Sequence, residues 1–418
     1  MRARLRNLAI FALAAAAACA PAPPPAPPEP RPEPVILDEA GIDAIAAILR
    51  MEDRREFAAA RLAAFLADPG PEIRRRAALA AGRIADPAAV PLLLRALADS
   101  SAAVRADAAF ALGELADTSA AVIDALAALL EPPDSVPVDV AREAVAALGK
   151  LATPSARAAV LALLDATAPP ALHGEALLAV WRFPRTEAMA ERVLPFLRSP
   201  DPELRWRAAY ALMRIADPRS VPALRAALID PEHRVREFAA RALRAPLVDS
   251  AGAADLARAV LAAVVQDSHP HVRINAVRAL ATYRSPAVAH TIAPFLADAD
   301  ANVAIAAAQA LGDLGGAAAS EALDLVVRDD SARLALRGAA LASLARTAPS
   351  RGIDRAAAFA ASPDWLVRFY AARALAAAPW NVALPTLRRL QHDRDPRVAA
   401  AAMESILAAG DSAAAAYP

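Results

Sequence analysis

The stretch Ile73–Leu97, IRRRAALAAGRIADPAAVPLLLRAL, decides the fold, because variants of it recur along the chain. Each copy starts with an apolar residue and an arginine, continues through an alanine-rich segment, and ends with Asp-Pro, Val-Pro and leucines. The spacings between copies run from 30 to 37 residues, which is the range of solenoid repeats. Aligned on Gly82, the equivalent positions are Gly113, Gly149, Trp181, Met213, Arg244, Ala281, Gly312, Ala342, Ala376 and Leu407.

Each copy divides into two amphipathic helices. In residues 201–230, Leu204, Ala208 and Leu212 recur at helical spacing, an Asp-Pro pair follows, and Val221 and Leu224 continue the pattern on a second helix. One such pair cannot bury its apolar face alone, but stacked pairs share a continuous core. The sequence therefore predicts an all-α, right-handed superhelix of about 11–12 helix pairs over residues 38–410.

The ends of these helices carry recognisable signals. Asp201 and the Asp-Ser pair at 267–268 are expected to supply oxygens that cap first helices. Pro91, Pro222 and Pro385 are expected in the first turn of second helices, where proline loses no hydrogen bond.

Composition supports a helical array and disfavours nucleic-acid binding. Hydrophobic residues make up 57% of the 418 residues and aromatic residues only 4%, because alanine, the best helix former, is abundant. Lys plus Arg equals Asp plus Glu at 46 each, and no tract is strongly basic. Nucleic-acid-binding proteins normally carry a basic excess or stripe.

The N-terminus reads as an export signal. Arginines precede a short apolar run, so residues 1–18 are predicted to be a signal peptide. The run from Ala16 to Cys19 resembles a bacterial lipobox, and the resemblance implies that Cys19, the only cysteine, is lipidated. A plain signal peptide with a chance cysteine is the alternative.

Residues 19–37 form a linker that follows the predicted anchor. Nine of the fourteen residues from 21 to 34 are proline, which predicts an extended, semi-rigid spacer. No aspartate follows Cys19, and by resemblance to Gram-negative lipoproteins this favours the outer membrane, with the chain facing the periplasm.

The phrase from Ile73 to Leu97 resembles the HEAT-repeat family, in the short form also seen in bilin-lyase-like bacterial proteins. Proteins of this family generally act as scaffolds that grip other macromolecules. The resemblance implies that the arginine after the first apolar residue pairs with an acid of the neighbouring unit. By matching position, that structural role falls on Arg74, Arg105, Arg205, Arg236, Arg273 and Arg368.

Three segments depart from the repeat. Extra residues stand at Pro132–Pro137 and at Ala245–Asp255, where loop tolerance and a binding face are both open interpretations. Residues 411–418 are predicted to be an incomplete tail, too short for a second helix. The array also resembles the front part of lipoproteins in which HEAT repeats precede a peptidyl-prolyl isomerase domain, so a helical portion of, or partner for, such an enzyme is an alternative.

Little in the sequence points to catalysis. His173-Gly174-Glu175 resembles one His-Glu dyad of HEAT-fold di-iron hydroxylases, but no second dyad accompanies it. His269 and His271 have no third ligand close in sequence. No nucleophile elbow or phosphate loop is found. We therefore expect a non-enzyme without cofactor or metal, and keep a metal-dependent HEAT enzyme as a remote alternative.

Aromatic residues are the best sequence clue to a binding face. Trp206 and Tyr210 are four residues apart and share one side of a helix, and Phe369 and Tyr370 occupy comparable places in a late repeat. Aromatic residues and arginines anchor interfaces, although packing between adjacent repeats is the alternative. The sequence predicts a scaffold, attached to the membrane only through its lipid, that binds a protein or peptide.

Overall fold

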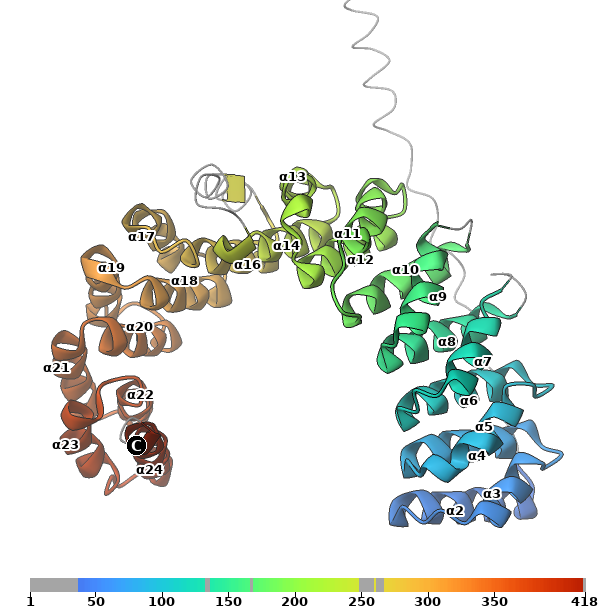
Figure 1. Cartoon of the computed structure of the whole chain (residues 1–418). Coiled ribbons are helices and arrows are strands. Elements are labelled where there is room, and N and C mark those ends of the chain that lie inside the picture. Colours follow the sequence, from blue (N-terminus) through green and yellow to red (C-terminus); the bar gives the residue numbers. More distant parts are fainter. Residues whose placement is uncertain (1–36, 132–135, 166–167, 248–258, 261–266, 416–418) are drawn as a thin grey trace, which may run out of the picture. The chain divides into compact units, whose positions relative to one another are not determined.

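The computed structural model describes residues 37–131, 136–165, 168–247, 259–260 and 267–415. Every regular element in these ranges is a helix, and the elements alternate as first and second helices of successive repeats (Figure 1). The predicted all-α solenoid is therefore confirmed. Residues 1–44 and 45–418 form two compact units, and the described end of the first unit is the start of α2, where the Asp38 carboxylate accepts the Gly41 amide at 2.8 Å.

The first helices begin each repeat. They are α2 (Glu39–Arg54), α4 (Pro71–Ile84), α6 (Ala102–Leu115), α8 (Val138–Leu151), α10 (Pro170–Ala179), α12 (Pro202–Ile215), α14 (His233–Ala242), α16 (Pro270–Ala281), α18 (Ala301–Leu314), α20 (Leu334–Thr347), α22 (Trp365–Leu375) and α24 (Pro396–Ala415). From α4 to α22, each first helix packs on the first helix of the next repeat, as α4 does on α6 and α6 on α8 (Figure 1).

The second helices are no longer than the first helix of the same repeat, and three of them continue as 3-10 turns. They are α3 (Ala59–Leu66), α5 (Val90–Ala96), α7 (Ala120–Ala128), α9 (Pro154–Asp165), α11 (Glu187–Val193), α13 (Val221–Ala226), α17 (Pro286–Ile292), α19 (Gly316–Arg328), α21 (Pro349–Ala360) and α23 (Trp380–Leu390). The 3-10 turns are η2 (Pro87–Ala89), η3 (Val180–Arg182), η4 (Leu194–Arg198), η5 (Pro218–Ser220), η6 (Ala227–Ile229), η7 (Ala245–Leu247) and η8 (Ala293–Ala297).

Small residues let consecutive first helices approach closely. Leucines such as Leu112 and Leu148 are fully buried, and alanines fill most of the remaining core. A Cβ atom added to Gly82 would lie 2.7 Å from the Cα of Ala111, and real Cβ atoms essentially never show such a contact. The glycine at the alignment position therefore allows α4 to contact the backbone of α6 directly.

A single left-handed residue connects the two helices of several repeats. Ala85 and Ala216 follow α4 and α12 with φ angles of 61° and 52°, a conformation that costs a non-glycine residue about 1–2 kcal/mol. The next residues, Asp86 and Asp217, accept backbone amides of η2 and η5 and so start the second half of the repeat. In these two repeats the Asp-Pro pair therefore marks the turn between the first and the second helix.

Asp201 caps α12, because its carboxylate accepts the Glu203 amide at 2.8 Å. The expected cap at 267–268 is wrong: the N-cap of α16 is His269, and the Asp267 carboxylate accepts the His269 amide from outside the helix. The Asp267 oxygens are also bound by an arginine of the previous repeat, which holds this residue in the turn.

Two helix ends also differ from expectation. Pro385 lies inside α23, because this helix begins at Trp380, directly after Pro379. Helix α24 continues to Ala415, beyond the predicted end at residue 410, because the alanines there favour helix. The predicted signal peptide, Cys19 and almost all of the proline-rich linker lie outside the described residues, as do most of the residues that lengthen the repeats at 132–137 and 245–255.

Candidate functional site

Arg74 shows the bonding of the predicted structural arginines. Its Nε and Nη2 atoms donate to the Asp99 carboxylate at 2.7 and 2.8 Å, and Nη1 donates to the carbonyls of Asp68 and Pro69 at 2.9 and 3.0 Å. The planar guanidinium therefore ties the turn before its own repeat to the turn before the next. We call this ion pair and four equivalents the arginine ladder; the others are Arg205–Asp230, Arg236–Asp267, Arg273–Asp298 and Arg368–Asp393.

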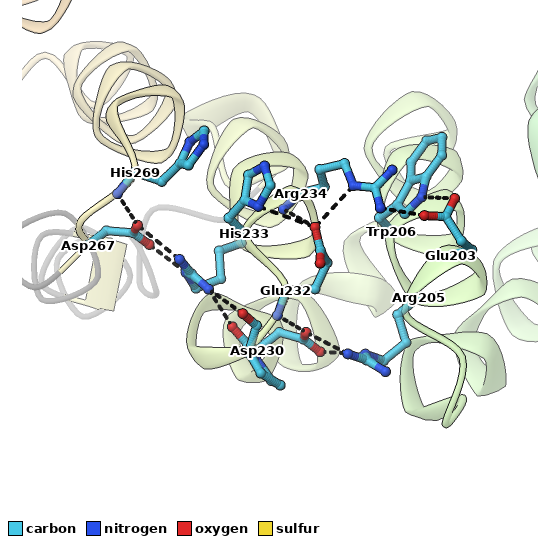
Figure 2. Close-up of polar contacts among 11 residues, drawn as sticks. Glu203, Arg205, Trp206, Asp230, Glu232, His233, Arg234, Asp267 and His269 are labelled. Carbon is cyan, nitrogen blue, oxygen red and sulfur yellow. Dashed lines mark hydrogen bonds and ion pairs between the residues drawn. The ribbon is translucent and has the colours of Figure 1, made fainter. Parts of the chain in front are cut away.

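Three of these pairs, formed by Arg205, Arg236 and Arg273, belong to consecutive repeats. Figure 2 shows Arg205 and the turns at Asp230 and Asp267. Arg205 binds the Asp230 carboxylate, while Nη1 of Arg236 donates to the Asp230 carbonyl at 2.7 Å. Arg236 in turn binds the Asp267 carboxylate, and Nη1 of Arg273 donates to the Asp267 carbonyl at 3.1 Å. One turn thus receives bonds from the arginines of two successive repeats.

Arg105 departs from the ladder. Its Nη1 donates to the Asp99 and Ser100 carbonyls at 2.7 and 3.2 Å, but no described residue offers it a carboxylate. The residue 25 positions later, where most ladder arginines have their aspartate, is the buried Leu130. Arg105 therefore fixes the turn before its repeat without the ion pair expected for it.

The ladder aspartates are held in their charged form. The bond from Arg74 lowers the pKa of Asp99 below its ordinary value, and the bond from Arg368 does the same for Asp393. Burial by itself raises the pKa of Asp267, but the bonds from Arg236 and the His269 amide outweigh burial and lower it. Because these charges are neutralised within the chain, the ladder offers little net charge to a partner.

Trp206 and Tyr210 belong to a row of four aromatic rings. The Trp206 ring stacks on Phe238 at 6.0 Å, and the Tyr210 ring meets Phe238 and Trp181 edge-on at 5.3 and 6.2 Å. We call Trp181, Trp206, Tyr210 and Phe238 the aromatic cluster; all four are half-buried. They come from η3, α12 and α14, so the cluster joins three successive repeats.

Arginines cover the open faces of these rings. The Arg214 guanidinium lies 3.8 Å from the centre of the Trp181 ring, and that of Arg234 lies 5.1 Å from the Trp206 ring. The Trp206 Nε1 donates to Glu203 at 2.8 Å, and Arg234 pairs with the same carboxylate (Figure 2). These bonds lower the pKa of Glu203. The cluster combines packing between repeats with half-exposed aromatic and arginine side chains, the types that anchor interfaces.

The second predicted aromatic pair is divided between two environments. The Phe369 ring meets Trp365 and Tyr370 edge-on at 6.5 and 5.9 Å, and Arg397 lies 3.3 Å from the Trp365 ring centre. The Tyr370 ring occupies the space above Gly338, where a Cβ would collide with it. Tyr370 therefore packs against α20, while Phe369 stays half-buried among rings and arginines.

The histidines do not assemble a metal site in the described part of the chain. Glu175 accepts bonds from Arg142, and the His173 ring contacts Phe196 at 5.1 Å. His269 stacks on His233 at 3.9 Å and lies 5.4 Å from His271, and burial, followed by these two histidines, lowers its pKa. Among the described residues no group of three His, Cys, Asp or Glu side chains could hold a metal ion.

A hollow of about 980 Å³ was not predicted from the sequence. It lies over α14, α16, α18 and α20. Its described lining includes one acid, Asp313, and five arginines, which are Arg241, Arg244, Arg278, Arg284 and Arg346. The only sequence signal for it is the recurrence of arginine in the last turns of α14, α16 and α20. Sequence cannot show that acidic partners are missing there.

None of the described helices is both long enough and apolar enough to cross a membrane. No curated protein matches the chain. Among solved structures, the chain is similar to an engineered protein, with 22% identity and a TM-score of 0.36 over 84% of this chain and 98% of that chain. It is also similar to the karyopherin Kap121p bound to the extreme C-terminus of the protein phosphatase Cdc14p, with 14% identity and a TM-score of 0.48 over 90% of this chain and 49% of that chain.

The sequence profile of HEAT repeats matches residues 58–141, 159–244, 190–259 and 257–342, which together make up more than half of the chain. The matched ranges hold helices α3 to α7, α10 to α14 and α16 to α19 in full. This chain belongs to the HEAT-repeat family.

Proposed function

We propose that this chain is a non-catalytic HEAT-repeat scaffold that binds a protein or peptide partner and is held at the bacterial outer membrane by a lipid on Cys19. HEAT-repeat solenoids are typically used for protein–protein interaction. The observation that carries the binding part is the aromatic cluster, which places half-exposed tryptophan, tyrosine and arginine side chains side by side across three repeats. The anchoring part rests on the lipobox-like run before Cys19 and the proline-rich spacer after it.

Anchoring through Cys19 predicts a clear change in fractionation. Replacing Cys19→Ala should move the chain from the membrane fraction to the soluble periplasmic fraction and remove its labelling by a fatty-acid analogue, because acyl chains supply the membrane affinity. Fractionation of cells expressing each form, followed by immunoblotting, measures this. If both forms fractionate identically and neither takes up the acyl label, Cys19 is not lipidated, and residues 1–18 act as a plain signal peptide.

Partner binding through the aromatic cluster predicts the loss of specific crosslinks. Trp206→Ala/Tyr210→Ala should weaken a partner's binding by about 2 kcal/mol or more, the usual size of an interface hot spot. Crosslinking in envelope fractions followed by mass spectrometry should then show one or more proteins lost from the partner list.

The matched control is Trp380→Ala/Phe295→Ala, which removes two half-buried aromatic side chains from α23 and η8. Circular dichroism checks that both double variants remain helical. A partner list unchanged by the first variant, or changed equally by the control, would show that the cluster only packs repeats together.

A further inference from the structure

The hollow over α14, α16, α18 and α20 brings together several arginines that have no acidic partner among the described residues. Arg241, Arg244, Arg278 and Arg284 are exposed, and no described residue forms an ion pair or hydrogen bond with their guanidinium groups. Arg346 pairs with Asp313 at 3.2 Å, and that aspartate is the only acid among the described residues of the lining. The chain as a whole has equal numbers of acids and bases, so the hollow is a local excess of positive charge.

The position at a helix end accounts for only some of these arginines. A cation in the last turn of a helix is favourable by itself. In some repeats such a cation also has an acidic partner in the preceding repeat. Arg83 at the end of α4 pairs with Glu52 at 2.8 Å, and Lys150 at the end of α8 pairs with Glu114. Arg241 and Arg278 hold last-turn places without such an acid, and Arg244 and Arg284 lie beyond the helix ends.

The size and lining of the hollow select among anionic ligands. About 980 Å³ is far larger than one inorganic anion needs and extends over four repeats. None of the described residues that line it is aromatic, although proteins that bind single-stranded nucleic acid stack bases on aromatic rings. The exposed Gln309 amide in the lining can bond to a peptide backbone. Guanidinium groups bind carboxylates with two parallel bonds.

We propose that this hollow, the arginine groove, binds an extended protein segment rich in glutamate and aspartate. Carboxylates spaced along the segment would meet the arginines of α14, α16 and α20 and those that follow α14 and α16, while Gln309 of α18 bonds to its main chain. Recognition of acidic motifs by arginine clusters is an established mode of peptide binding. The inference deepens the protein-binding part of the proposed function and does not require the lipid anchor.

Fluorescence anisotropy with the purified full-length chain tests the proposal. The probe is a labelled twelve-residue peptide in which glutamate alternates with glycine and serine, and its glutamine counterpart is the uncharged control. The double charge reversal Arg241→Glu/Arg278→Glu should weaken binding of the acidic peptide by roughly tenfold or more, because attraction becomes repulsion on two adjacent helices. Binding of the unaltered chain should also fall with added salt.

The matched control is Arg225→Glu/Arg388→Glu, which changes the net charge equally at exposed arginines of α13 and α23 outside the groove. It should alter affinity less than about twofold, as expected for distant, screened charges. Circular dichroism and thermal unfolding of both variants show whether either reversal disturbs the fold.

Competition with inorganic phosphate, a phosphoserine peptide and a single-stranded oligonucleotide identifies the ligand. Displacement by the acidic peptide alone at low concentration supports the proposal. Equal binding of the glutamine peptide, equal weakening by the control variant, or tighter groove-dependent binding of phosphate, phosphopeptide or oligonucleotide would overturn it. The acidic peptide can fail to bind the arginine groove while the crosslinks that depend on Trp206 are still observed. In that case the scaffold function is retained and only the acidic ligand is rejected.

Discussion

Replacing Asp393→Asn should destabilise the repeat formed by α22 and α23 by about 2–3 kcal/mol, because it leaves a buried cation without its counter-charge. The side chains of Arg368 and Asp393 are only 7% and 8% exposed, which makes this the least exposed ion pair of the arginine ladder. Among the single side chains of the ladder, only that of Asp267 is less exposed. The asparagine oxygen can still accept the Asp395 amide, so the turn is preserved and the charge is the main loss.

Hydrogen exchange of amides in α22 and α24 measures this effect locally, which matters because a repeat array need not unfold in one step. The matched control is Asp313→Asn, which removes the partner of Arg346 at a side chain that is 68% exposed. That change should cost less than about 1 kcal/mol. Equal effects of the two variants would show that burial does not determine how much an ion pair of the ladder contributes to stability.

Gly82→Ala should destabilise the first repeats by about 1–3 kcal/mol. This is opposite to the usual effect, since replacing glycine by alanine inside a helix normally stabilises it. In an open helix, alanine is about 1 kcal/mol more favourable than glycine. Here the added methyl group would lie 2.7 Å from the Cα and 2.8 Å from the Cβ of Ala111, so α4 and α6 must separate. Thermal unfolding followed by circular dichroism measures the change.

Gly174→Ala is the matched control in another first helix. Its added Cβ would meet the guanidinium of Arg207, the free end of a flexible side chain that can move aside. This variant should be neutral or slightly stabilising. A stabilising Gly82→Ala would mean that the two helices are not in backbone contact.

The repeat phrase was sufficient to predict the helices, because its signals act locally. The Asp-Pro pair at 217–218 starts η5 as its capping oxygen and proline would suggest. Asp267 was assigned wrongly because its real partners include Arg236, which is distant in sequence. The expected place of Pro385 was wrong because α23 begins at Trp380, directly after Pro379. The proline of the recurring Val-Pro pair has its equivalent in Pro385, but here that position lies inside the helix.

The candidate sites were predictable only in part. The spacing of Trp206 and Tyr210 placed both rings on one helix face, but Phe238 and Trp181, which complete the aromatic cluster, come from neighbouring repeats. The arginine groove was missed because it depends on which acids are absent around Arg241 and Arg278 in three dimensions. A sequence with equal numbers of acids and bases gives no sign of that absence.

The turns that serve two arginines link the folding of neighbouring repeats. If the repeat that contains Arg236 unfolds, the Asp230 carbonyl loses the hydrogen bond from Arg236. The Asp230 carboxylate, which binds Arg205, is then held less firmly in position. Each loss therefore lowers the barrier for the next, and repeats 202–298 should open as one cooperative block. Ala304 stands where the next repeat would have its ladder arginine, so the block should end there. On heating or under tension, we expect the array to separate first at this position.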